Sequence, residues 1–358
     1  MFNASRLALA RKRRQLTKKD LATKAGVNSL TLTRLEAGKT IDPSADTVNA
    51  LAAVLRYPPA FFYQDECDQL STEAVSFRSL SALTARQRDA ALAAGPIAFL
   101  FDGWVSQRFD LPKPDLVDLR DENPIAAADA LRAHWGLGTK PIQHVVKLLE
   151  SKGVRVFALS EQNKNVDAYS CWYGDTPYIF LNTFKSAERS RFDAAHEVGH
   201  LVLHIHGASG SRDVEREADS FAAAFLINRG DLLGSLPRIN SLSQIVDAKE
   251  RWGVSVAALA RTAFDAGLIS DWHYRELCKK ISYLGYRTIE PKARAREKSV
   301  LWHMVFEELW KDGITRDTIA KELKLPPDEI ESLVGQLVAD QSAHGGRSAG
   351  PRQPLRAI

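Results

Sequence analysis

The sequence predicts a multidomain, mainly α-helical protein with one small β-sheet. Its 358 residues exceed what one ordinary hydrophobic core holds, so we expect two or three domains. Apolar residues recur at helical spacing in several segments, whereas a strand pattern stands out in one hairpin. Charge is uneven: residues 1–65 carry eleven Lys/Arg and five Asp/Glu, a net +6, which leaves −2 for the rest of a chain whose total is +4. This change in net charge along the chain predicts a polyanion-binding module attached to a different domain.

Composition narrows the class of protein. Hydrophobic residues make up 45% and charged residues 26%, which is typical of a soluble globular protein. The most apolar stretch, residues 90–101, is short and interrupted by Pro96, and the first residues lack a signal-peptide pattern. The three cysteines, at positions 67, 171 and 278, are odd in number and far apart, as in a reducing compartment. We therefore expect a cytoplasmic protein with no membrane partner.

Residues 5–36 predict a helix, then a helix, a sharp turn and a third helix. Thr17 caps the second helix in TKKDLATKAGV, and Gly26 permits the turn. The third helix, in NSLTLTRLEAGK, ends at Gly38, and SADTVNALAAVL predicts a fourth helix that closes the bundle. A bundle whose charges form only a solvated face is the alternative to a DNA-binding module.

This order resembles the Cro/CI-type (XRE) helix-turn-helix family of DNA-binding regulators. The positions that match are Leu21, Ala22, Ala25, Gly26, Val27, Leu32, Leu35, Glu36 and Gly38. The resemblance implies that residues 1–65 bind double-stranded DNA as a homodimer, with residues 28–34 as the recognition helix in the major groove. It places the DNA contacts at Ser29, Leu30, Thr31, Thr33 and Arg34, with Lys18 suited to phosphate.

Residues 194–204 read AAHEVGHLVLH and contain the HExxH pattern of zinc hydrolases. A helix turns 100° per residue, so His196 and His200 project from one face, one turn apart. Two imidazoles at that spacing fill two corners of a tetrahedral zinc site, and Glu197 lies beside the open corner. Because HExxH also arises by chance as an ordinary histidine pair, the hypothesis depends on a third ligand.

Two more histidines compete for the position of third ligand. His206 has the spacing of HExxHxxGxxH enzymes, but that class needs glycine at position 203, where this chain has Leu203. His204 lies two turns beyond His196, which is too far along one helix to converge easily on the same ion.

The better candidate for the third ligand lies in residues 213–227, DVEREADSFAAAFLI, which predict a second buried helix. Glu215 and Asp219 stand four apart beside its apolar stripe, whereas Glu217 is expected on the other face. Both are expected to face inward, where a carboxylate needs a partner. Their ExxxD arrangement resembles that of the gluzincins, in which Glu binds zinc, so we choose Glu215 as the metal ligand. Asp219 then orients a ligand histidine from outside the coordination sphere.

AHEVGHLVLH followed by EREADSFAAAFL resembles the ImmA/IrrE family of metallopeptidases, whose members cut Cro/CI-type repressors. The resemblance implies zinc bound by His196, His200 and Glu215, with Glu197 as the general base. It implies an endopeptidase acting on a Cro/CI-type repressor or on itself. Upstream, DAYSCWYGDTPYIFLN predicts a β-hairpin, and in the family such a strand borders a cleft where an extended substrate could add as a further strand.

The chain then divides into five predicted parts. These are the helix-turn-helix domain at 1–65, a helical linker at 66–120, an α+β, zincin-like metallopeptidase domain at 121–290, a helical segment at 291–342 and a disordered tail at 343–358. Residues 314–334 could form a second helix-turn-helix or only a helical hairpin that packs on the body. The family resemblance covers roughly residues 5–290.

Two functions remain open from the sequence alone. The first is a DNA-binding regulator fused to a zinc endopeptidase, with Tyr169, Tyr178, Arg189 and His204 as candidate oxyanion donors. The second is a non-enzymatic DNA-binding regulator whose zinc site is structural or senses a signal. Coordination alone does not require Glu197, so its presence favours the enzyme.

Overall fold

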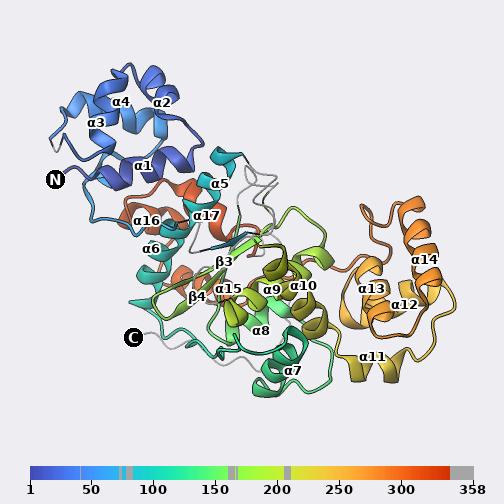
Figure 1. The fold of residues 1–358 in the computed structure, drawn as a ribbon. Coiled ribbons are helices and arrows are strands. Elements are labelled where there is room, and N and C mark those ends of the chain that lie inside the picture. The colour runs from blue at the N-terminus through green and yellow to red at the C-terminus, as the bar shows by residue number, and fades with distance from the viewer. Residues whose placement is uncertain are drawn as a thin grey trace.

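The computed structural model describes residues 1–40, 42–71, 75–77, 84–159, 166, 168–204 and 211–338. It confirms the expected fold class: a mainly helical chain with one small sheet, an N-terminal helical bundle and a helical C-terminal part (Figure 1). None of the helices in these ranges is long and apolar enough to cross a membrane. The tail predicted at 343–358 and His206 lie outside the described residues.

The N-terminal bundle is built as its turn residues predict. Its elements are α1 (Ala4–Arg13), α2 (Lys18–Ala25), α3 (Ser29–Glu36), α4 (Ala45–Leu55) and the 3₁₀ turn η1 (Pro59–Tyr63). Thr17 and Asp20 form a capping box at the start of α2, and Asn28 caps α3. Gly26 has a φ of 64°, a left-handed conformation that glycine adopts without strain. The angle between α2 and α3 is therefore set by local sequence.

A connecting segment leads from the bundle to the sheet and back into helices. It contains the short strand β1 (Ser76–Phe77), α5 (Ala85–Leu92) and α6 (Ala94–Ser106). Before β1, Asp68 accepts a hydrogen bond from the Tyr173 hydroxyl at 2.7 Å, and Val75 is buried. Part of the segment that we predicted to be a helical linker is thus an edge strand of the sheet.

The sheet has four strands in the order β1-β3-β4-β2. β3 (Ala168–Tyr173) and β4 (Thr176–Leu181) form the expected antiparallel hairpin, in which Tyr173 pairs with Thr176. Gly174, with a φ of 56°, begins its two-residue turn. β2 (Arg155–Ala158) runs parallel to β4, and β1 pairs antiparallel with the outer edge of β3.

Successive side chains of a strand point to opposite faces of the sheet, so the core consists of two clusters, one on each face. On β3, Ala168 and Trp172 join the cluster on one face, whereas Tyr169 and Cys171 join the cluster on the other. Helices packed on the first face include α7 (Pro124–His134), α8 (Val145–Ser151), α9 (Ala187–Leu203) and α10 (Arg212–Leu226). The side-chain direction of each strand residue therefore decides whether it can face α9.

Four further helices extend away from the sheet at the end opposite the N-terminal bundle (Figure 1). They are α11 (Arg229–Ser235), α12 (Leu242–Trp252), α13 (Val256–Asp265) and α14 (Asp271–Tyr283).

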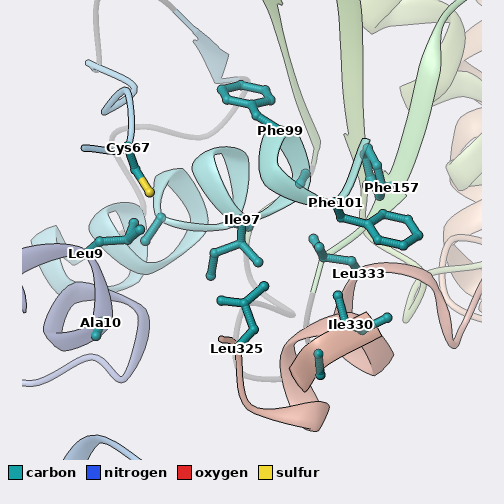
Figure 2. Close-up of a cluster of buried hydrophobic side chains, with 14 of the residues drawn as sticks. Leu9, Ala10, Cys67, Ile97, Phe99, Phe101, Phe157, Leu325, Ile330 and Leu333 are labelled. Atoms are coloured by element: carbon teal, nitrogen blue, oxygen red, sulfur yellow. The ribbon is translucent and has the colours of Figure 1, made fainter. Parts of the chain in front are cut away.

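The C-terminal helices return to the middle of the molecule. They are α15 (Leu301–Lys311), α16 (Arg316–Glu322) and α17 (Pro327–Val334). α16 and α17 lie between the N-terminal bundle and the sheet (Figure 1), whereas Trp302 of α15 donates a hydrogen bond to the carbonyl of Val156 in β2. Figure 2 shows Leu9 of α1, Ile97 of α6 and Ile330 of α17 in one buried cluster that continues to Phe157 of β2. A single core thus joins segments from both ends of the chain.

Candidate metal centre

Two packed helices, α9 and α10, carry the predicted metal-binding residues. Ser186 caps the start of α9 and Ser211 caps the start of α10. Gly199 lets the helices approach closely, because a Cβ at this position would lie 3.1 Å from the ring of Phe221. The two helices bury apolar side chains against each other, and α9 also packs on the sheet, so their separation is fixed by core packing.

His196, His200 and Glu215 converge on one point between the two helices. Nε2 of His196 lies 3.0 Å from Nε2 of His200. The Glu215 carboxylate oxygens lie 3.3 Å from Nε2 of His196 and 3.6 Å from Nε2 of His200. Within the described ranges, these residues form the group whose ligand atoms could hold a metal ion, all within 4.8 Å of one another.

The donor atoms at this point suit a cation. Both carboxylate oxygens of Glu215 are buried, yet neither accepts a hydrogen bond from any residue that the structure describes. Their contacts with the two histidines are therefore close without being hydrogen-bonded, and an unpaired buried carboxylate is costly. Two imidazole nitrogens and one carboxylate are a ligand set that zinc takes in hydrolytic enzymes. The residues present thus fit a zinc ion.

Asp219 lies where the sequence predicted it, one turn beyond Glu215 on α10. Its Oδ1 is 2.9 Å from Nδ1 of His196, the ring nitrogen that does not face the other candidate ligands. A carboxylate in this place fixes the ring orientation and leaves Nε2 free of its proton.

Glu197 is buried beside the trio and is held by the sheet. The Ser170 hydroxyl donates a hydrogen bond to Oε2 of Glu197 at 2.7 Å. Burial raises the pKa of Glu197 to about 8, against the lowering effects of His196 and of this hydrogen bond. We did not predict Ser170, although alternation along β3 puts it on the same face as Ala168 and Trp172, which faces α9.

Comparison with protein families agrees with this geometry. Residues 149–264, which include α9 and α10, match the IrrE N-terminal-like domain of a peptidase family. Residues 7–62 match the helix-turn-helix family. The chain thus contains a region similar to a helix-turn-helix domain, followed by a region similar to an IrrE-like domain. Both predicted resemblances are confirmed, in the predicted order. No curated protein matches the chain.

His204 and Glu217 of the IrrE-like domain form a contact that the sequence did not predict. Nε2 of His204 lies 2.9 Å from Oε2 of Glu217, and its Nδ1 lies 3.1 Å from Nδ1 of His200. We expected Glu217 on the other face of its helix, and that expectation is wrong. His204 ends α9 with a φ of −127°, outside helical geometry, and this brings its ring to the flank of α10.

Like His204, the other three candidate oxyanion donors are held in other contacts. The Tyr169 hydroxyl donates to the carbonyl of Ala91, and the Tyr178 hydroxyl donates to Asp102. Both tyrosines belong to the core on the face of the sheet opposite α9. Arg189 pairs with Asp193 at 3.0 Å on its own helix. The structure therefore removes the two tyrosines as oxyanion donors.

The edge of β3 that borders Glu197 is covered by the connecting segment. Ser76 of β1 pairs with Ser170, and Phe77 pairs with Tyr169. An extended peptide that adds to this edge would have to take the place of β1.

α3, which carries most of the predicted DNA-contacting residues, lies on the side of the helix-turn-helix domain away from the sheet (Figure 1). Ser29, Leu30, Thr33 and Arg34 of α3 are exposed, and Thr31 is half-buried. Lys18 of α2 is also exposed and lies 3.4 Å from Glu36. In the described structure Arg13 and Arg14 at the end of α1, and Tyr57 after α4, contact α17. The surface that would meet DNA is thus open.

Proposed function

We propose that the protein is a DNA-binding transcriptional regulator fused to a zinc-dependent endopeptidase. The observation that carries the proposal is the convergence of His196, His200 and Glu215 beside the buried Glu197. The family matches support the general assignment, which is a DNA-binding regulator with a metallopeptidase-like domain.

His196, His200 and Glu215 would hold the zinc ion, and Asp219 would orient His196. When bound, zinc supplies a Lewis acid that acidifies water and polarises a carbonyl group. Three protein ligands leave a fourth corner for these reactants, as catalytic zinc sites require.

Glu197 would act as the general base. A positive charge close by would lower its pKa below the value of about 8 that burial gives, so that it accepts a proton at a carboxylate oxygen. Ser170 holds one of its oxygens through the 2.7 Å hydrogen bond and so fixes the direction of the carboxylate. The proton would then pass from Glu197 to the leaving amine of the cleaved peptide bond.

The substrate would be a protein, either a Cro/CI-type repressor or this chain itself. The helix-turn-helix match at residues 7–62 supports this assignment, because this chain itself carries a domain similar to the DNA-binding domain expected in such a repressor. An extended segment would pair with β3 after displacing β1.

The DNA-binding half would work as a homodimer on two half-sites. The exposed face of α3 supports the DNA-binding part of this proposal, because the recognition helix of the fold enters the major groove with such a face. The two halves would thus place a peptidase on the DNA that the protein regulates.

The test is to incubate the zinc-loaded protein with itself and with Cro/CI-type repressors encoded nearby. Mass spectrometry should find defined fragments that vanish with a chelator and return when zinc is restored. Fragments that persist in the chelator would show a contaminating protease, and the absence of fragments from every substrate would contradict the endopeptidase.

A further inference from the structure

A chain of three side chains continues outward from His200, beyond the residues assigned to the metal. His204 caps the end of α9, four residues after His200, and Glu217 reaches it from α10. The His204 side chain is 7% exposed, whereas Glu217 is 50% exposed. The contacts therefore lead from the buried centre to a solvated carboxylate.

The positions of the protons along this chain follow from the chemistry of imidazole. A neutral imidazole has one N–H donor and one lone pair. Nε2 of His200 lies among the converging ligand atoms, so it needs its lone pair there and its proton must be on Nδ1. That N–H then donates to Nδ1 of His204, 3.1 Å away.

The same reasoning assigns the proton of His204. Since Nδ1 of His204 accepts, its proton is on Nε2, which donates to Oε2 of Glu217 at 2.9 Å. An ionised carboxylate only accepts hydrogen bonds, so the chain ends there with every donor matched to an acceptor. One arrangement of protons therefore satisfies both contacts and leaves His200 ready to bind a metal.

Each of the two candidate ligand histidines is thus linked at Nδ1 to a carboxylate. Asp219 contacts Nδ1 of His196 directly at 2.9 Å, whereas Glu217 reaches Nδ1 of His200 through the ring of His204. Both carboxylates come from α10. The helix that supplies Glu215 would also orient both histidines of α9.

We propose that His204 and Glu217 are positioning residues that hold His200 in its metal-binding orientation and tautomer. This inference rests on the proposed metal site. His204 contacts the Nδ1 side of the His200 ring, opposite Nε2, so it lies outside the ligand group and is not placed to donate to an oxyanion there.

The experiment measures zinc affinity of the full-length protein by competition with a chelator. His204→Leu removes the acceptor and keeps much of the volume, and Glu217→Ala removes the terminal carboxylate. Each should weaken zinc binding by about 10- to 100-fold, the usual effect of losing a group that orients a ligand. His204→Asn places an amide oxygen near the position of Nδ1 and should restore most of the affinity.

Asp213→Ala is the matched control, because Asp213 is an exposed acid on α10 that pairs with Arg216 outside the chain of contacts. It should bind zinc as the wild type does. A second readout is the visible spectrum with cobalt in place of zinc, which should change in His204→Leu and recover in His204→Asn.

Three outcomes would decide against the proposal. Wild-type affinity in both His204→Leu and Glu217→Ala would refute the positioning role. Equal weakening of zinc binding in His204→Leu and His204→Asn would show that His204 acts through packing alone. If His204→Leu fails to fold, Glu217→Ala, at an exposed position, still tests the positioning role. A wild-type protein that binds no zinc would instead refute the proposed metal site.

Discussion

At the scale of single residues, the centre separates the groups that would bind metal from the group that would move a proton. His196, His200 and Glu215 point their ligand atoms at one another. Glu197 is turned toward Ser170 of the sheet and accepts its hydrogen bond. A purely structural metal site has no need of this fourth buried group, whereas peptide hydrolysis needs a base.

Glu197→Gln separates the enzyme from a regulator whose zinc is structural or sensory. Gln keeps the shape and can still accept from Ser170, but it cannot take a proton from water. Zinc content and DNA binding should stay near wild type, and cleavage should fall by at least ~10²-fold, the usual share of a general base. The measurements are fragment formation and regulation of a reporter gene in cells. Regulation that survives Glu197→Gln but is lost with His196→Ala would contradict regulation by proteolysis.

The sequence predicts the position of some residues of this site and not that of their neighbours. His196 and His200, and Glu215 and Asp219, each stand four apart, and helical geometry alone puts such pairs on one face. Glu217 could not be placed in this way. Its contact depends on where α9 ends and on how α10 crosses it, which are properties of the packed core. Strand alternation could have predicted which face of the sheet Ser170 occupies, but nothing in the sequence shows that α9 covers that face.

At the scale of elements, the separation of α9 and α10 sets the distance from the histidines to Glu215. Gly199 keeps that separation small, since a Cβ there would lie 3.1–3.3 Å from three carbon atoms of the buried Phe221. Gly103 in α6 is also in a helix, but a Cβ there would meet nothing within 4 Å. The two glycines therefore form a matched pair for the same substitution.

Gly199→Ala should destabilise the protein, whereas Gly103→Ala should stabilise it by up to about 1 kcal/mol through helix propensity. Overpacking against Phe221 costs about 1–3 kcal/mol, so the net loss for Gly199→Ala should reach about 2 kcal/mol. Urea unfolding of the two variants is the measurement. Equal gains in both would show that the contact between the helices is loose.

The face of α3 determines how residues 1–65 bind DNA. Their net charge of +6 predicts an affinity for duplex DNA that falls steeply as salt rises. Arg34→Ala should weaken specific binding by roughly 1–3 kcal/mol if the side chain reaches a base edge. Selection from a pool of genomic fragments, followed by titration at several salt concentrations, measures both. Binding that is undetectable or independent of salt would contradict the assignment of this face.

Local sequence was a good guide to the helix-turn-helix domain because caps and a glycine turn define it. It could not show what the C-terminal helices contact. Nε of Arg13 on α1 donates to Glu329 on α17, and these residues are 316 positions apart. Such a contact leaves no periodic pattern in either segment. The predicted domain boundaries also depend on such contacts between distant segments, and they stay predictions.

At the scale of the whole molecule, α17 fastens the DNA-binding domain to the body. Glu329 is 1% exposed, and it accepts hydrogen bonds from Arg13 at 2.7 Å and from the Tyr57 hydroxyl at 2.6 Å. The neighbouring Asp328 pairs with Arg14, but its side chain is 59% exposed. Two adjacent acids of one helix thus make a buried and an exposed ion pair with the same domain.

Glu329→Ala should cost about 3–5 kcal/mol, because it leaves the buried Arg13 without its partner. Asp328→Ala should cost at most about 1 kcal/mol, as is usual for an exposed pair. Urea unfolding gives the stabilities, and limited proteolysis reports release of residues 1–65 from the body. Similar losses in the two variants would show that Glu329 does not hold the domains together.

The central claim is that one zinc ion is bound by His196, His200 and Glu215, and metal analysis of the purified protein tests it most directly. Wild type should contain about one zinc per chain, as a site with three protein ligands would hold. Glu215→Ala and His200→Ala should lose most of it, whereas His206→Ala should retain it. A wild-type protein without zinc, or a His206→Ala variant that alone empties the site, would contradict the account.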